Sequence, residues 1–290
     1  MSPVSTIDHG PMSISAENPA PPLLASPGSS RPVQEVVVAV FFGPLANLLV
    51  RLLAPTRITP PAIVVLHGLA GLAAALLLGA EGLIATAVLL QVRTLLDNAD
   101  GRLARATGRV SLTGRYLDTI VDFVVNAALF VALAVTTGQP LLAGAAFVAL
   151  AVVLTVDFNV SSLFAEVSGR APSDPHPTAT LAERALGAVY RAVFAPQDRA
   201  SRALVTGRLE RVLAAESDPA RIREATIAYH DRATVAVLAN LGLSTQLVAL
   251  GACLVLGAPV VYLWLALAPL PLLPALQLRR ERRARRALAS

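Results

Sequence analysis

Apolar residues are grouped along the chain in runs long enough to cross a bilayer as helices. A transmembrane helix needs about 20 apolar residues, and the chain holds six such runs, separated by short breaks such as "GAEG", "TTGQP" and "LGAP". The runs cover residues 59–80, 82–107, 111–137, 139–168, 229–257 and 259–279. Only helices satisfy all their backbone hydrogen bonds within one run of this length. The pattern therefore predicts an all-α polytopic membrane protein with six transmembrane helices.

The segments at the two ends of the chain have a different pattern. Residues 1–32 are rich in Pro, Ser and Ala without periodicity, which predicts a disordered tail. Residues 33–56 are apolar but short and interrupted by a Gly-Pro pair, so we expect an interfacial amphipathic helix, with a seventh span as the alternative. The six-helix transmembrane domain is then expected over residues 57–282, and a basic tail over residues 283–290.

A polar insert, residues 169–228, separates the fourth and fifth runs. Apolar positions recur at helical spacing in its segments "TLAERALGAVYRAVF" and "RALVTGRLERVLA". This spacing predicts two or three amphipathic helices on the cytoplasmic surface. The simplest interpretation of the insert is a solvated connector without chemistry of its own.

Composition supports the membrane class, and the placement of charge indicates the orientation. The chain is 55% hydrophobic and only 15% charged, with a mean hydropathy of +0.63, whereas about a quarter of the residues in a soluble domain are charged. All 24 basic residues are arginine, and none lies in the loops 79–82, 136–140 and 256–259. By the positive-inside rule these loops face outward and both termini are cytoplasmic. We therefore expect an integral protein of a prokaryotic cytoplasmic membrane, whose net charge of +5 requires no nucleic-acid partner.

One charged stretch, "LLDNADGRLARATGRVSLTGRYLDTIVDF" at residues 95–123, interrupts the second and third apolar runs. Helical spacing places the polar and small residues of its first half on one face: Asp97, Asp100, Gly101, Ala104 and Arg105. A second face repeats every four residues: Gly114, Asp118, Asp122 and Asn126. Because only a short break around Gly108 joins the two helices, we expect them to lie antiparallel, with their carboxylates facing each other across a shared cleft.

Four carboxylates in such a cleft cannot all stay ionised without compensating positive charge. A bound divalent metal supplies it, and ligands that are all oxygen favour Mg²⁺, Mn²⁺ or Ca²⁺. The alternative is that the charges only mark a cytoplasmic loop with Arg–Asp pairs at its edges. That alternative does not explain Asp97, Asp118 and Asp122, which lie within apolar runs.

The stretch fits the pattern D-x2-D-G-x2-A-R-x8-G-x3-D-x3-D at every fixed position, which resembles the signature of the CDP-alcohol phosphatidyltransferase family. The signature covers residues 97–122, and the number of spans extends the resemblance to about residues 59–280. The resemblance implies an enzyme that cleaves the pyrophosphate of a CDP-linked donor, releases CMP and passes the phosphoryl-bearing group to an acceptor hydroxyl. It also implies a homodimer and an active site that faces the cytoplasm.

The resemblance further implies roles for the individual residues of the signature. Two ions of Mg²⁺ or Mn²⁺ would be held by Asp97, Asp100, Asp118 and Asp122. Asp122 would also be the catalytic general base on the acceptor hydroxyl. The CDP site would be lined by Asp100, Gly101, Ala104, Arg105 and Gly114.

Polar residues elsewhere in the apolar runs are candidates for the acceptor site, because intramembrane polar residues usually face a bundle interior or a wet cavity. They are Arg93, Asn126, Asp157 and Asn159. For Asn126, Asp157 and Asn159 the alternative is hydrogen bonding between helices. Arg93 lies one turn before Asp97, so it either pairs with that carboxylate or holds a phosphate of donor or acceptor.

The expected reaction is transfer of a phosphatidyl group from CDP-diacylglycerol to a small polar alcohol in phospholipid biosynthesis. Glycerol 3-phosphate, an inositol phosphate or serine would be suitable acceptors. The alternative within the same chemistry is a CDP-activated alcohol as donor, with a lipid or polyol as acceptor. A more distant alternative is an ion-coupled transporter, which is disfavoured because neither inverted repeats nor broken helices are evident.

Overall fold

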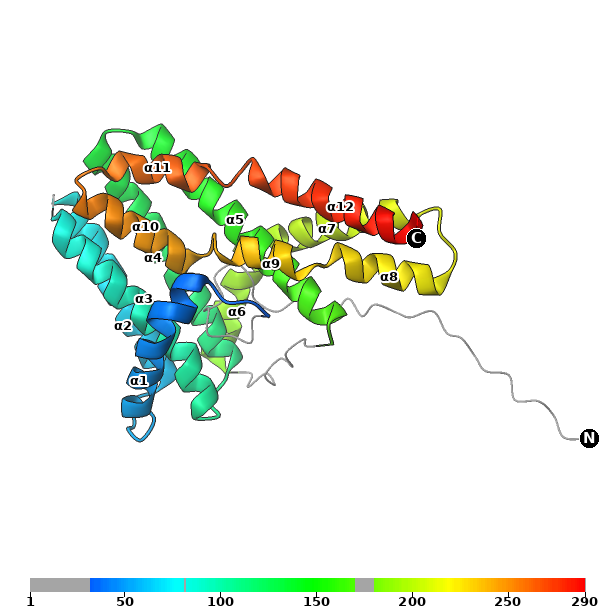
Figure 1. Cartoon of the computed structure of the whole chain (residues 1–290). Helices are drawn as coiled ribbons and strands as arrows, with labels where there is room; N and C mark the ends of the chain where they lie inside the picture. The colour runs from blue at the N-terminus through cyan, green and yellow to red at the C-terminus, as the bar shows by residue number, and fades with distance from the viewer. Residues whose placement is uncertain (1–31, 81, 170–179, 290) are drawn as a thin grey trace, which may run out of the picture.

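The computed structural model describes residues 32–80, 82–169 and 180–289, and within these ranges it contains helices and no strand. The helices are η1 (Val38–Phe42), a π-helix, and α1 (Gly43–Leu53), α2 (Pro60–Gly79), α3 (Leu83–Ala106), α4 (Leu112–Thr137), α5 (Pro140–Val167), α6 (Leu181–Val193), α7 (Ala195–Leu213), α8 (Pro219–Tyr229), α9 (Arg232–Ala239), α10 (Leu243–Val255), α11 (Pro259–Leu267) and α12 (Leu272–Ala289). They form one bundle from which α7, α8 and α12 extend at one end (Figure 1). The polytopic all-α membrane class is confirmed.

Five helical segments of the described chain are long and apolar enough to cross a membrane: Pro60–Gly79, Leu112–Thr137, Pro140–Val167, Pro219–Val255 and Pro259–Ala289. The expected span 82–107 folds as α3, a helix of 24 residues whose second half carries the charged residues of the signature. α3 packs against α1, α2 and α10, and Asp97 and Asp100 in its second half are buried.

The N-terminal helical segment Val38–Leu53 is apolar but shorter than the five long segments, and a span needs about 20 residues. It packs against the signature half of α3, where it shares an apolar cluster with Ala99 and Leu103. Ahead of it, Oε2 of Glu35 accepts hydrogen bonds from the backbone N (2.7 Å) and the hydroxyl (2.8 Å) of Thr245. This segment is thus anchored to α3 and α10, and its length does not support a seventh span.

α2 is the helix that joins the two halves of the signature, because it packs against both α3 and α4. Two glycines allow its close approach to α4. A Cβ atom on Gly68 would lie 2.6 Å from Cγ1 of Val121, and one on Gly71 would lie 2.4 Å from Cγ1 of Val125. Small residues permit such close helix packing in membranes, so α2 lies against both helices that carry the aspartates of the signature.

The turn between α3 and α4 reverses the chain within a few residues. Gly108 adopts a positive φ of 65°, which glycine adopts without steric cost, and the backbone N of Arg109 donates to the carbonyl of Ala104 at 2.8 Å. The hydroxyl of Ser111 then caps α4 by accepting from the backbone N of Gly114 at 3.1 Å. The reversal confirms that α3 and α4 are consecutive helices joined by a tight turn.

The insert contributes α6, α7 and α8, in agreement with the two or three helices expected there. α6 packs against α4, and α7 packs against α5, α6, α8 and α12. Residues 1–31 of the expected tail (1–32) and residues 170–179 of the insert lie outside the described residues.

Candidate active site

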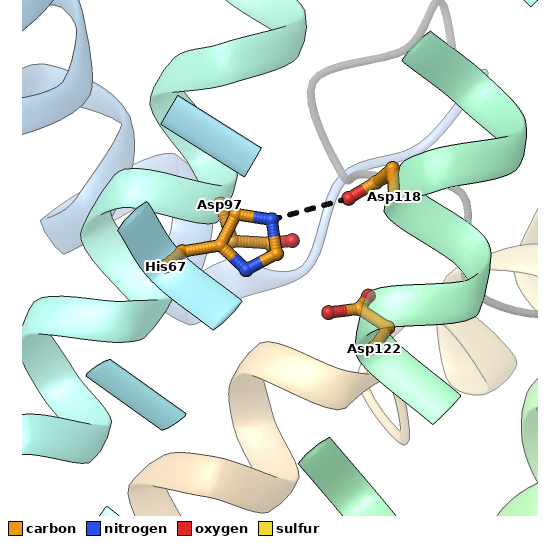
Figure 2. Close-up of side chains that lie close together, drawn as sticks. All are labelled: His67, Asp97, Asp118 and Asp122. Atoms are coloured by element: carbon orange, nitrogen blue, oxygen red, sulfur yellow. Dashed lines mark ion pairs between the residues drawn. The ribbon is translucent and has the colours of Figure 1, made fainter. Parts of the chain in front are cut away.

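The four aspartates of the signature come together between α3 and α4. α3 supplies Asp97 and Asp100, α4 supplies Asp118 and Asp122, and all four are buried. Figure 2 shows Asp97 on one side of the space and Asp118 and Asp122 on the other. The two carboxylate stripes therefore face one another, as the helical spacing predicts.

A histidine that we did not single out from the sequence completes this group. His67 of α2 is fully buried, and its Nε2 lies 3.4 Å from Oδ2 of Asp100 and 3.4 Å from Oδ1 of Asp118. One possible ligand atom from each of His67, Asp97, Asp118 and Asp122 lies within 4.8 Å of the others. The available signal was that His67 is the one titratable side chain in the apolar run 59–80, and intramembrane titratable residues are usually functional.

Arg93 is the fully buried cation of the site. Its Nη2 donates to Oδ1 of Asp122 at 2.5 Å, so the possible pairing with Asp97 is not the one the structure contains. Gly71 makes room for the arginine, because a Cβ atom there would lie 2.9 Å from Cδ of Arg93. Within the described chain, Nε and Nη1 of Arg93 are buried without a hydrogen-bond partner. The ion pair fixes one oxygen of Asp122.

The group fits a hard divalent cation. Four carboxylates surround the space, and the opposing side chains are one guanidinium, that of Arg93, and one imidazole, that of His67. Oδ1 of Asp97 is buried and accepts no hydrogen bond from the residues that the structure describes. Buried carboxylates that are not fully paired are the usual ligands of Mg²⁺ and Mn²⁺, so the cluster could hold a metal.

The other signature residues lie toward the turn and are more exposed than the aspartates. Gly101, Ala104 and Gly114 are partly exposed, and Arg105 is exposed. Small residues at these positions leave the helix backbone open to close approach by a ligand. The buried cluster is therefore bordered by an accessible rim at the end of α3 and the beginning of α4.

The acceptor candidates are distributed over three helices, with Arg93 on α3, Asn126 on α4, and Asp157 and Asn159 on α5. Asn126 is buried one turn beyond Asp122 on α4. On α5, Asp157 accepts a hydrogen bond from the hydroxyl of Ser161 at 3.3 Å. Asn159 donates to the carbonyl of Thr155 at 2.9 Å and to the insert at 3.3 Å. Of the four candidates, Arg93 and Asn126 share the neighbourhood of Asp122, whereas the side chains on α5 have partners of their own.

The partner of Asn159 in the insert is Asp198 of α7, which is itself buried. The other oxygen of this carboxylate accepts from the hydroxyl of Tyr190 at 2.9 Å. Tyr190 stacks on Tyr116 of α4, with 5.2 Å between the ring centroids. Burial raises the pKa of Asp198 to about 7, although the hydrogen bond from Asn159 acts in the opposite direction. The insert is thus packed onto the bundle beside the signature, in contrast to a solvated connector.

Comparison with known proteins adds one finding. A family model described as CDP-alcohol phosphatidyltransferase matches residues 57–205, just over half of the 290 residues. No curated protein and no solved structure gives a match.

We predict that docking of the insert depends on pH through Asp198. Its pKa is about 7 in the folded protein and about 3.9 in an unfolded chain, so the folded state holds the proton more tightly between these values. Stability should therefore fall as the pH rises from about 4 to 7 and then level off, by an amount of the order of 1–3 kcal/mol. Asp198→Asn should flatten this dependence, as measured by thermal unfolding at several pH values.

Glu224→Gln is the matched control, because it removes an exposed carboxylate from α8. This variant should keep the pH profile of the wild type. An Asp198→Asn variant whose midpoint still falls over the same pH range would contradict the assignment to Asp198.

Proposed function

Because the chain belongs to the CDP-alcohol phosphatidyltransferase family, we propose that it transfers a phosphatidyl group from CDP-diacylglycerol to the hydroxyl of a small polar acceptor. The observation that carries the proposal is the cluster of His67, Asp97, Asp118 and Asp122, all buried and within 4.8 Å. The family consists of transferases, and the apolar helical segments make the chain an integral membrane protein. A lipid-linked donor suits a site that lies within such a bundle.

Two divalent cations, Mg²⁺ or Mn²⁺, would be held by Asp97, Asp100, Asp118 and Asp122. When bound, they would neutralise the charge that develops on the pyrophosphate and make CMP a better leaving group. Gly101, Ala104 and Gly114 would let the nucleotide approach the helix backbone. Arg105 would contact it from the same rim, and Asp100 from the buried cluster. These roles are supported by the burial of the aspartates and the exposure of the rim.

Asp122 is the proposed general base. Arg93 engages its Oδ1, and in the described part of the chain no group donates to its Oδ2, which can take the proton of the acceptor hydroxyl. The acceptor oxygen then bonds to the phosphorus that carries the diacylglycerol. The bond from this phosphorus to the bridging oxygen of the pyrophosphate breaks, and CMP leaves with that oxygen.

Contacts to the acceptor are proposed for Arg93 and Asn126, which lie beside Asp122 on α3 and α4. Contacts to the acceptor are also proposed for Asp157 and Asn159, which in the structure are hydrogen-bonded to Ser161 and to the insert. We also propose that both termini and the active site face the cytoplasm, and that two copies of the chain form a dimer.

His67 is proposed as a nitrogen ligand of the metal site. Its Nε2 lies at 3.4 Å from two of the carboxylates. Its Nδ1 is buried without a hydrogen-bond partner among the described residues. An imidazole ligand suits Mn²⁺ better than Mg²⁺, since Mg²⁺ prefers oxygen ligands. A mixed nitrogen and oxygen site would therefore favour manganese.

The proposed reaction is tested by release of CMP from the purified protein. CDP-diacylglycerol, Mn²⁺ or Mg²⁺ and a panel of small alcohols should give CMP only when both metal and a suitable acceptor are present. Release of CMP from a CDP-activated alcohol, with none from CDP-diacylglycerol, would reverse the assignment of donor and acceptor. A protein that releases no CMP from any donor but moves ions across a vesicle membrane would be a transporter.

Asp122→Asn should separate the base from the metal ligands. General-base catalysis supplies about 10²–10⁴-fold, so kcat for CMP release should fall by that order. The dissociation constant of CDP-diacylglycerol, measured by calorimetry with metal present, should change by about threefold at most, since Asp97, Asp100 and Asp118 would still hold the metal. If donor binding is lost together with turnover, Asp122 is mainly a metal ligand, and if turnover survives it is not the base.

His67→Asn should remove a nitrogen from the metal site. Pulsed electron paramagnetic resonance of bound Mn²⁺ should show coupling to an imidazole nitrogen in the wild type, with the isotope pattern altered by ¹⁵N-histidine labelling. The variant should lack this coupling and bind Mn²⁺ at least about tenfold more weakly. His230→Gln is the control, because that buried histidine lies against Arg280 of α12 and should leave the coupling unchanged. A wild-type spectrum without nitrogen coupling would exclude His67 as a ligand.

A further inference from the structure

The C-terminal helix α12 has two faces of different character. Its inner face packs against α8, where Arg280 is buried with its guanidinium carbon 4.0 Å from the centre of the Tyr229 ring. Nε of Arg280 also donates to the carbonyl of Tyr229 at 3.0 Å. This buried arginine serves the packing of two helices and is not available to a ligand.

The outer face of α12 carries four further arginines at positions i, i+3, i+4 and i+7. We call them the outer arginine stripe: Arg279, Arg282, Arg283 and Arg286. Together with Ala275 and Leu278 they line an open hollow of about 430 Å³. The lining is therefore apolar at the end of α12 nearer α11 and basic beyond it.

The charge of the stripe is only partly neutralised within the described chain. Arg279 lies 3.4 Å from Asp231, and Arg283 donates only to a backbone carbonyl. Arg282 and Arg286 form neither an ion pair nor a hydrogen bond with the described residues. Glu281, the acidic residue within this stretch of α12, accepts instead from Arg208 of α7 at 3.1 Å. Like charges three and four residues apart on a helix repel, so an anion bound along the stripe would stabilise it.

The stripe lies in the C-terminal part of the last long apolar helical segment of the chain, after the run of apolar residues with which that segment begins. α12 belongs to the apolar segment Pro259–Ala289, and Leu278, the last apolar residue before the arginines, is exposed. Arginines directly beyond a membrane span lie in the headgroup region of the leaflet, where anionic lipids attract them. Guanidinium groups bind phosphate with two parallel hydrogen bonds.

We propose that the outer arginine stripe is a binding site for the phosphate headgroup of an anionic phospholipid, with the start of its acyl chains against Ala275 and Leu278. The succession of apolar and basic lining residues matches the polarity of a lipid, from acyl chain to headgroup. The hollow is open along the helix, as a site at the edge of a bilayer must be. The site is separate from the aspartate cluster and does not depend on the proposed function.

Lipid retention by the purified full-length protein tests this proposal. Native mass spectrometry during titration with phosphatidylglycerol or phosphatidylcholine should show preferential retention of phosphatidylglycerol by the wild type. Arg282→Gln combined with Arg286→Gln should weaken that retention by about tenfold or more, because each arginine at the membrane surface contributes to the attraction. High salt should weaken the wild type more than this variant.

Arg221→Gln combined with Arg223→Gln is the matched control, since it removes the same charge from exposed positions of α8. The control should retain phosphatidylglycerol like the wild type, and unfolding midpoints in phosphatidylcholine should show that both variants are folded. Equal retention of the two lipids by the wild type would overturn the proposal, as would equal losses in both variants. A stripe variant that changes the number of chains per particle, with its lipid retention intact, would identify the stripe as a protein interface instead.

Discussion

The burial of four carboxylates inside an apolar bundle is the constraint on which the rest of this structure depends. Charges in a medium of low dielectric constant are tolerated when they are paired, hydrogen-bonded or bound to a metal. Arg93 and His67 approach Asp122, Asp100 and Asp118, but one guanidinium and one imidazole do not balance four carboxylates. On the proposed function, cations from solution would complete the charge balance of the bundle, which would link cation binding to the stability of α3 and α4.

The way in which α2 packs makes this compensation possible. Its glycines face Val121 and Val125 of α4, and any side chain at these positions would overlap them. The resulting close contact brings His67 to the carboxylates, and the absence of a side chain on Gly71 leaves the volume that Arg93 occupies. The glycines that allow tight helix packing are thus neighbours of His67 on α2 and of Arg93 on the adjoining α3. A larger residue at Gly71 would disturb packing and electrostatics together.

The sequence was sufficient to predict those parts of the molecule that depend only on the periodicity within one helix. Helical spacing placed Asp97 and Asp100 on one face and Asp118 and Asp122 on another, and these faces do meet in the structure. Spacing within one helix contains no information about which other helix packs on it. For that reason His67 was missed. The attachment of the insert through Asp198 and Tyr190 was also missed, since it depends on contacts between α5, α6 and α7.

Arg93 illustrates the same limit within the signature itself. Sequence proximity suggested Asp97, one turn away on the same helix, as its partner. The arginine instead bonds to Asp122, 29 positions later on α4. A side chain one turn away on the same helix remains close whatever the tertiary fold, but its nearness does not decide which carboxylate the arginine contacts. To predict this pair, one would have to know how α3 and α4 are oriented relative to each other when both pack on α2.

The two charged regions of the molecule are opposite in sign and differ in how their charge is balanced. The aspartate cluster lies inside the bundle and is bordered by a rim that includes Arg105, whereas the outer arginine stripe lies on the surface of α12. A pyrophosphate is attracted by a basic rim but repelled by a cluster of carboxylates whose charge is not balanced. On the proposed function, the donor can therefore enter only after the negative charge of the cluster has been neutralised. Under that proposal, burial of the carboxylates would impose an order on binding, with cations first and the CDP-linked donor second.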